Sequence, residues 1–191
     1  MYYLVTNPAC PYCYGNDRII ERELPNLNDN DIMLLPYTLT ADIQEFDNKL
    51  YETYKNSFIN ETIPYLKTLN ITLPSFYKKE NISPSRLVFI TYYYLREKNL
   101  GLKFYHEITK RFFQTDFNYG NIDEIAAIVS ELGLNKEVYL AALNNPLYEQ
   151  QYLDNLQQID ELDIESVPAY IIDNEILLGI FKGIAKIKEQ Q

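Results

Sequence analysis

The sequence is poor in the residues that mark several large classes of protein. Only 6 of its 191 residues are Gly and 9 are Pro, which excludes collagen-like and low-complexity chains. Only 17 residues are Lys or Arg against 27 Asp or Glu. The net charge of −10 disfavours nucleic acids and membrane surfaces as partners, since both are anionic. With one histidine and two cysteines a zinc site is hard to build, and we expect no metal.

The sequence also lacks long apolar runs and a targeting segment. No stretch approaches the roughly 18 apolar residues that a membrane-spanning helix needs. The apolar run at residues 1–5 ends at Thr6-Asn7-Pro8, and no basic segment precedes it. We therefore expect a soluble, cytoplasmic protein. Its composition, 47% hydrophobic and 23% charged, is that of one globular domain or of a small domain with an insertion.

The only two cysteines, Cys10 and Cys13, have the spacing of a redox dithiol. A secreted disulfide scaffold would use more cysteines and place them farther apart. In a reducing compartment, a lone C-x-x-C pair is most simply explained as a dithiol that cycles with a disulfide. The alternative is two unrelated cysteines that stand three positions apart by chance.

The pair lies between a predicted strand and a predicted helix. Residues 2–6 are aromatic and β-branched, and Pro11 suits the first turn of a helix that runs to Leu24. Cys10 would then be the N-cap, where free backbone N–H groups and the helix dipole lower the pKa of a thiol. We expect Cys10 to attack the substrate disulfide and the more buried Cys13 to resolve the mixed disulfide.

The rest of the chain reads as a strand, a long helical segment, two strands and a helix. Residues 32–39 form the predicted second strand, with Pro36 at an edge or a bulge. Helical spacing dominates from residue 43 to about 162, and Ser83-Pro84 predicts a helix start within it. The strands at 169–172 and 175–178 flank a tight turn. Further expected features are a four-residue repeat of Phe46, Leu50, Tyr54 and Phe58, and helices over 122–132, 136–143 and 148–162.

Bringing the two ends of the chain together gives an α/β protein of β-α-β and β-β-α halves. The sequence therefore predicts a four-stranded domain made of residues 1–42 and 160–191. An all-helical domain would be inserted at residues 43–159.

The motifs of the chain resemble those of the DsbA-type thiol–disulfide oxidoreductases of the thioredoxin superfamily. The resemblance covers nearly the whole chain and rests on Cys10-Pro11-Tyr12-Cys13-Tyr14, Phe104-Tyr105-His106-Glu107, Phe112-Phe113, Gly133-Leu134, and residues 139–143 and 167–173. It implies a thioredoxin-like fold with a helical insertion. It also implies a cytoplasmic oxidoreductase or isomerase that exchanges disulfides of proteins or small molecules through its C-P-Y-C dithiol. No cofactor is implied beyond the dithiol itself, with glutathione as a candidate reductant.

The resemblance also implies a substrate-binding site that spacing alone does not reveal. In thioredoxin-like proteins the proline corresponding to Pro168 is cis and lies against the C-x-x-C. The backbone of the preceding residue, here Val167, pairs with the substrate chain. Pro11 and Tyr12, between the cysteines, are further expected substrate-binding residues.

Two departures from the strongly oxidising members of the family bear on the direction of the reaction. Tyr12 stands where those members have a histidine, and it supplies no positive charge. Residues 33–35 contain no charged side chain where some oxidising relatives keep a buried lysine. Both features predict a potential below the roughly −120 mV of the strongest oxidants. His106 lies within a helical pattern far from the cysteines, and we expect it to be structural.

Two other functions fit the resemblance. One branch of DsbA-like proteins acts as an adaptor that delivers a transcription regulator to a protease, and Asn7-Pro8-Ala9-Cys10 is similar to the start of that branch. Such an adaptor would have a specific protein partner. The second alternative is a glutathione-using enzyme like the kappa-class transferases or the chromene-carboxylate isomerases. These enzymes share the helical insertion but usually have serine where Cys10 stands.

Overall fold

The structure is a computed structural model, and it describes residues 1–39, 55–73 and 83–191. Three members of the predicted four-residue repeat, Phe46, Leu50 and Tyr54, lie outside these residues. The fourth member begins a five-residue π-helix, η1 (Phe58–Thr62), which continues into α4 (Ile63–Thr68).

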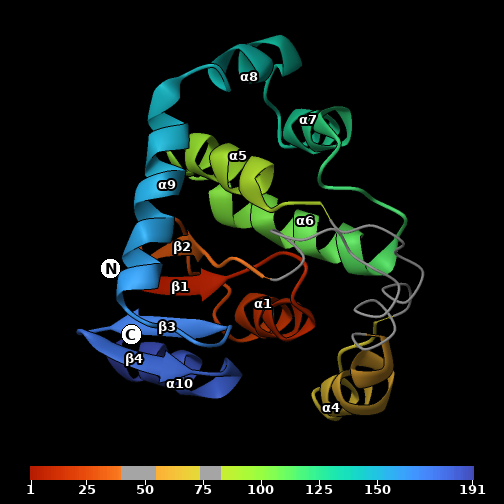
Figure 1. Cartoon of the computed structure of the whole chain (residues 1–191), viewed down its shortest axis with the longest axis vertical. Coiled ribbons are helices and arrows are strands. Elements are labelled where there is room, and N and C mark those ends of the chain that lie inside the picture. Colours follow the sequence, from red (N-terminus) through yellow and green to blue (C-terminus); the bar gives the residue numbers. More distant parts are fainter. Residues whose placement is uncertain (40–54, 74–82) are drawn as a thin grey trace.

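Four strands form one mixed sheet in the order β2-β1-β3-β4 (Figure 1). The first strand, β1 (Tyr2–Thr6), pairs in parallel with β2 (Ile32–Pro36) and antiparallel with β3 (Ala169–Ile172). A tight turn then leads β3 into the antiparallel β4 (Glu175–Leu178). Three strands have their predicted bounds. The edge strand β2 ends three residues early, at Pro36, which pairs with Thr6, the last residue of the neighbouring strand β1.

Helices cover both faces of the sheet (Figure 1). On one face, α1 (Pro11–Glu23) and α10 (Ile180–Gln190) pack over Leu4, Leu34 and Tyr170 in the larger core cluster. On the other face, α9 (Pro146–Glu161) packs Ile159 against Val5 and Leu35 in a smaller cluster. Alternate residues of each strand thus face the two layers, as the period of a strand requires.

The remaining helices pack beyond one edge of the sheet (Figure 1). They are α5 (Arg86–Arg96), α6 (Gly101–Gln114), α7 (Ile122–Glu131) and α8 (Lys136–Ala142). The expected helices over 122–132 and 136–143 are found within one residue. The division into domains at residues 42, 43, 159 and 160 stays a prediction.

Two predicted helix starts are corrected. The helix expected at Ser83-Pro84 begins at Arg86, because the Ser83 hydroxyl bonds the Asn118 side chain at 3.0 Å instead of capping the helix. The helix expected from residue 148 begins two residues earlier, where the Asn145 side chain accepts the N–H of Leu147 at 3.1 Å.

Close packing of Tyr170 on Gly183 joins the sheet to α10. A Cβ atom at Gly183 would lie 2.1 Å from the Tyr170 ring, and the Tyr170 hydroxyl is held by Asn16 Oδ1 at 2.8 Å. We expect Gly183→Ala to lower the free energy of unfolding by about 1–3 kcal/mol, because the ring has no free space to enter. Urea denaturation measures this, with exposed Lys182→Ala as the control. Equal midpoints for the two variants would contradict the prediction.

Candidate active site

The two cysteines lie where β1 leads into α1. Cys10 is the N-cap of α1, with φ −79° and ψ 119°, and its Sγ accepts the backbone N–H of Cys13 at 3.3 Å. Pro11 occupies the first helical position. Both cysteines are free, and their side chains are buried, with exposed fractions of 6% for Cys10 and 1% for Cys13. The predicted N-cap position of Cys10 is thus confirmed.

The two thiols have different environments. The hydrogen bond from the Cys13 thiol lowers the pKa of Cys10, and the backbone N–H groups of Tyr12 and Cys13 add to this effect against the opposing effect of burial. Burial raises the pKa of Cys13 well above its ordinary value, and the hydrogen bond and charge of Cys10 raise it further. The geometry therefore favours a Cys10 thiolate that accepts a hydrogen bond from a Cys13 thiol.

Val167 and Pro168 lie beside Cys10, although 157 positions separate Val167 from Cys10 in the chain. The Cys10 Sγ is 3.9 Å from the carbonyl oxygen of Val167, and the Val167–Pro168 peptide bond is cis, as the resemblance implied. Pro168 is buried and Val167 is half-buried. The structure brings Cys10, Cys13, Val167 and Pro168 together, and their roles toward a substrate stay predictions.

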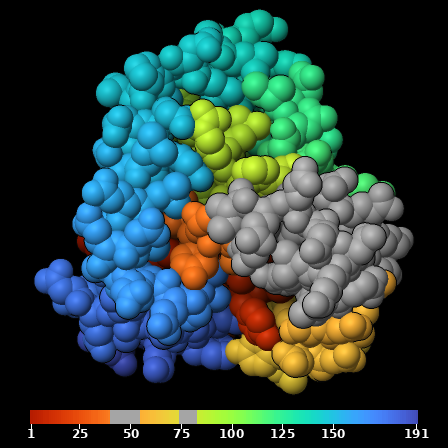
Figure 2. Space-filling model, in the orientation of Figure 1, coloured from red at the N-terminus to blue at the C-terminus, as the bar shows by residue number. Residues whose placement is uncertain are grey.

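Tyr12 contributes an aromatic surface next to the cysteines. Its ring lies 5.7 Å from the ring of Tyr65 in α4, centroid to centroid. Tyr65 and the neighbouring Ile59 are 37% and 43% exposed. Figure 2 shows the segment of residues 55–73, in orange and yellow, next to the red N-terminal segment. Sequence reasoning missed Tyr65, because only the tertiary fold brings it to Tyr12.

Two hydroxyl groups lie behind Cys13. The hydroxyl of Thr6, at the end of β1, is 2.9 Å from the hydroxyl of Tyr105 in α6, and both side chains are 1% exposed. The Thr6 hydroxyl and the Asn7 backbone N–H hydrogen-bond the Cys13 sulfur, and both lower the pKa of Cys13 against the larger effect of burial. The sequence analysis named Tyr105 within a motif but assigned it no function, and it assigned none to Thr6.

A buried ionic cluster lies one helical turn below Cys13. Asp17 of α1 accepts hydrogen bonds from His106 Nδ1 at 2.5 Å, Thr109 Oγ1 at 2.5 Å and Arg18 Nη2 at 2.6 Å. Although burial opposes it, the charge of His106, its hydrogen bond and the charge of Arg18 lower the pKa of Asp17 to about 2. Asp17 in turn raises the pKa of His106 against the effect of burial. His106 therefore belongs to a structural cluster, as expected, and does not contact the thiols.

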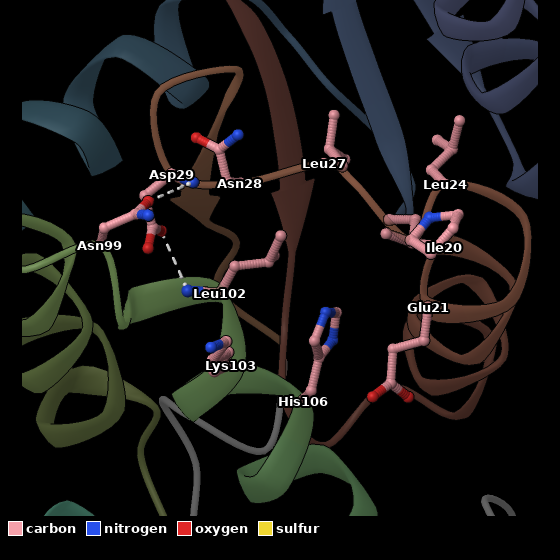
Figure 3. Close-up of a pocket in the computed structure, with 11 residues that line it drawn as sticks. Ile20, Glu21, Leu24, Leu27, Asn28, Asp29, Asn99, Leu102, Lys103 and His106 are labelled. Carbon is pink, nitrogen blue, oxygen red and sulfur yellow. Dashed lines mark hydrogen bonds between the residues drawn. The ribbon is translucent and has the colours of Figure 1, made fainter. Parts of the chain in front are cut away.

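A pocket of about 250 Å³ lies between α1, the loop that follows it and the start of α6 (Figure 3). The Asp29 carboxylate at its edge accepts the backbone N–H groups of Gly101 and Leu102 at 2.8 and 2.9 Å, and so caps α6. Asn99 accepts the backbone N–H of Asp29 at 3.3 Å. Neither Cys10 nor Cys13 lines this pocket, so it is separate from the thiol site.

Residues 1–39, 55–73 and 83–191 contain no group of three or more His, Cys, Asp or Glu side chains that could hold a metal ion. Within the same ranges, no helix has the length and apolar character needed to cross a membrane.

The sheet, its helices and the C-x-x-C pair at the start of α1 together define a thioredoxin-like domain. The family model of the DSBA-like thioredoxin domain matches residues 5–185, and the chain belongs to this family. The fold class predicted from the sequence is thereby confirmed.

Individual relatives are distant in sequence. The chain is 24% identical over 176 residues to the uncharacterized protein YwbO of Bacillus subtilis, and the match covers 90% of this chain and 86% of YwbO. The solved structure of the cytosolic disulfide reductase DsbM from Pseudomonas aeruginosa superposes with a TM-score of 0.72 at 13% identity, over 99% of this chain and 97% of DsbM. A 2-hydroxychromene-2-carboxylate isomerase superposes with a TM-score of 0.69 at 14% identity, over 99% of this chain and 93% of the isomerase. These two structures share the fold.

Proposed function

We propose that the protein is a thiol–disulfide oxidoreductase that reduces or isomerises disulfides of proteins or small molecules through Cys10 and Cys13. The observation that carries this proposal is the asymmetry of the pair. Cys10 is an N-cap thiol with a lowered pKa, and Cys13 is a buried thiol that donates a hydrogen bond to it. A stable thiolate next to a second thiol is what a two-step disulfide exchange needs.

In the first step, the Cys10 thiolate attacks one sulfur of the substrate disulfide. A bond forms between Cys10 and that sulfur, and the substrate S–S bond breaks. The other substrate sulfur leaves as a thiolate and takes a proton from solvent. In the second step, Cys13 attacks Cys10, which releases the remaining substrate thiol and leaves a Cys10–Cys13 disulfide. Two molecules of reduced glutathione, which leave as glutathione disulfide, or one protein dithiol then return the pair to its reduced form.

The surroundings of Cys10 support a bound peptide or small disulfide. The half-buried Val167 places its carbonyl oxygen 3.9 Å from the Cys10 sulfur. Pro11 and Tyr12 are half-buried, and Tyr65 extends the aromatic surface of Tyr12. We infer that the substrate binds at the surface that these residues form beside Cys10.

Reduction in the cytoplasm is the direction that the residues favour. Tyr12 carries no positive charge to stabilise a Cys10 thiolate further, and β2 presents only the apolar Met33, Leu34 and Leu35. Both features support a potential below the roughly −120 mV of the strongest oxidants. The likeness of fold to a cytosolic disulfide reductase, DsbM, is consistent with this direction.

A trapping experiment tests the proposal and separates it from the adaptor alternative. Cys13→Ser is expected to hold many partner proteins as mixed disulfides with Cys10, because the resolving thiol is absent. The partners should be released by dithiothreitol and should be lost in the double variant Cys10→Ser/Cys13→Ser. One partner held equally by both variants would instead show an adaptor and would contradict the proposed enzyme.

A further inference from the structure

We propose that Thr6, held in place by Tyr105, is a positioning residue for the second step: its hydroxyl donates a hydrogen bond to the Cys13 sulfur as that sulfur becomes an anion. The inference rests on the proposed function. It gives Tyr105, a residue of the helical segment and of the Phe104-Tyr105-His106-Glu107 motif, the role of orienting the Thr6 hydroxyl.

The direction of the hydrogen bonds follows from the number of protons available. Each hydroxyl has one proton, and the Thr6 and Tyr105 oxygens are 2.9 Å apart in a site where both side chains are 1% exposed. If Thr6 donated to Tyr105, the buried Tyr105 proton would need another acceptor, and among residues 1–39, 55–73 and 83–191 Tyr105 forms its hydrogen bond with Thr6 alone. An unpaired buried donor is costly. Tyr105 therefore donates to Thr6, which leaves the Thr6 proton for Cys13.

The need for this donor arises only after substrate has bound to Cys10. In the free dithiol, the Cys13 thiol donates to Cys10, and the negative charge rests on Cys10. In the mixed disulfide, Cys10 carries no charge, and the anion must form on Cys13, which is 1% exposed. A buried anion without hydrogen-bond donors is strongly destabilised. The donors that contact this sulfur are the Asn7 backbone N–H and the Thr6 hydroxyl.

The second step balances without any further reactant. The Cys13 sulfur forms a bond to the Cys10 sulfur while the bond between Cys10 and the substrate sulfur breaks. Cys13 is oxidised, the substrate sulfur is reduced, and the proton that Cys13 gives up ends on the departing substrate thiolate. Burial keeps the pKa of Tyr105 well above its usual value, so Tyr105 keeps its proton and remains a donor throughout.

Ellman's reagent separates the two steps in one rapid-mixing measurement. Attack by Cys10 releases one coloured thiol, and resolution by Cys13 releases a second. We expect Thr6→Val to leave the first release within about twofold of wild type and to slow the second by about 10- to 100-fold, the range of a hydrogen bond to a charged group. Tyr105→Phe should slow the second release by about 3- to 10-fold, because Thr6 loses its orientation. Thr6→Ser should restore the second release.

The chain offers a matched control in a second buried hydroxyl pair. The Thr91 and Tyr139 hydroxyls lie 2.8 Å apart and both side chains are fully buried, but the pair is in the helical segment and has no contact with the cysteines. Thr91→Val and Tyr139→Phe should leave both releases unchanged. An equal effect of Thr6→Val and Thr91→Val, or equal slowing of the two releases by Thr6→Val, would overturn the inference.

A pH profile tests the inference even if exchange is absent. In a Cys10→Ala background, the rate of Cys13 alkylation by iodoacetamide reports the thiolate fraction of Cys13. Thr6→Val should move this profile to higher pH and Thr6→Ser should return it, whereas a merely structural role for Thr6 would not move it. An unmoved profile overturns the role of Thr6. Absence of any thiol release by the wild-type protein would overturn the proposed function instead.

Discussion

Replacing Cys10 by serine is expected to reduce disulfide exchange to the uncatalysed rate. A serine hydroxyl is not ionised near neutral pH, and Cys13 cannot take over, because burial raises its pKa and leaves it 1% exposed. With Ellman's reagent at neutral pH, wild type should release two coloured thiols per chain. Cys13→Ser should release one at nearly the wild-type rate of the first step, and Cys10→Ser should release none on that time scale.

The most specific part of this prediction is that the two variants should release different numbers of coloured thiols. Cys10→Ser and Cys13→Ser each remove one sulfur from the same four-residue motif, so a general effect on folding would weaken both to the same degree. Rapid release by Cys10→Ser would show that Cys13 is the attacking thiol and would contradict the assignment. Thermal unfolding monitored by circular dichroism confirms that both variants are folded.

The second large effect is expected at Asp17. Asp17→Asn keeps the shape of the side chain but leaves His106 and Arg18 without their buried counter-charge. Removing one partner of a buried ion pair costs about 3–5 kcal/mol, and we expect the free energy of unfolding to fall by this amount. Urea denaturation at pH 6 measures it. The control is Glu21→Gln, which removes a carboxylate 2.6 Å from Arg18 that is 42% exposed, and which should cost less than about 1 kcal/mol.

The pH dependence of stability follows from the same cluster. The pKa of Asp17 falls from 3.8 to about 2 on folding, so its stabilising contribution is complete above about pH 4 and is lost as the pH falls toward 2. The pKa of His106 rises on folding above 6.5, so its contribution is complete below 6.5 and is lost as the pH rises through the folded value. The contribution of this cluster should therefore be largest between about pH 4 and 6.5, and Asp17→Asn should remove the loss of stability that the cluster causes on either side of this range. An unchanged profile in the variant would contradict the role of the cluster.

The sequence predicted the parts of the fold that local chemistry determines. The strands around the thiol site have strong β-formers, and Cys10-Pro11 is a helix start by virtue of the proline. The turn at Asp173-Asn174 has φ values of +52° and +65°, a conformation that Asp and Asn adopt more readily than other side chains. These features need no knowledge of distant residues.

The prediction was weaker where a residue acts through the tertiary structure. Serine is a residue type that often caps helices, but the Ser83 hydroxyl donates a hydrogen bond to Asn118, which lies 35 positions along the chain. Thr6 and Tyr105 are 99 positions apart and meet only in the folded chain. Val167 and Pro168 were located through resemblance to a family, since spacing alone gives no reason to place them beside Cys10.

The position of Val167 in the chain has a consequence for the protein during its synthesis on the ribosome. The side-chain and backbone groups that lower the pKa of Cys10 belong to residues 12 and 13, which directly follow it in the chain. Val167, whose carbonyl oxygen contacts the sulfur, is made 157 residues later. At about 5–20 residues per second, roughly 8 to 30 s pass between the two events on the ribosome. During that interval the Cys10 sulfur of each new chain lacks its contact with Val167, so a reducing medium would keep the growing chain in its thiol form just as it would the finished one.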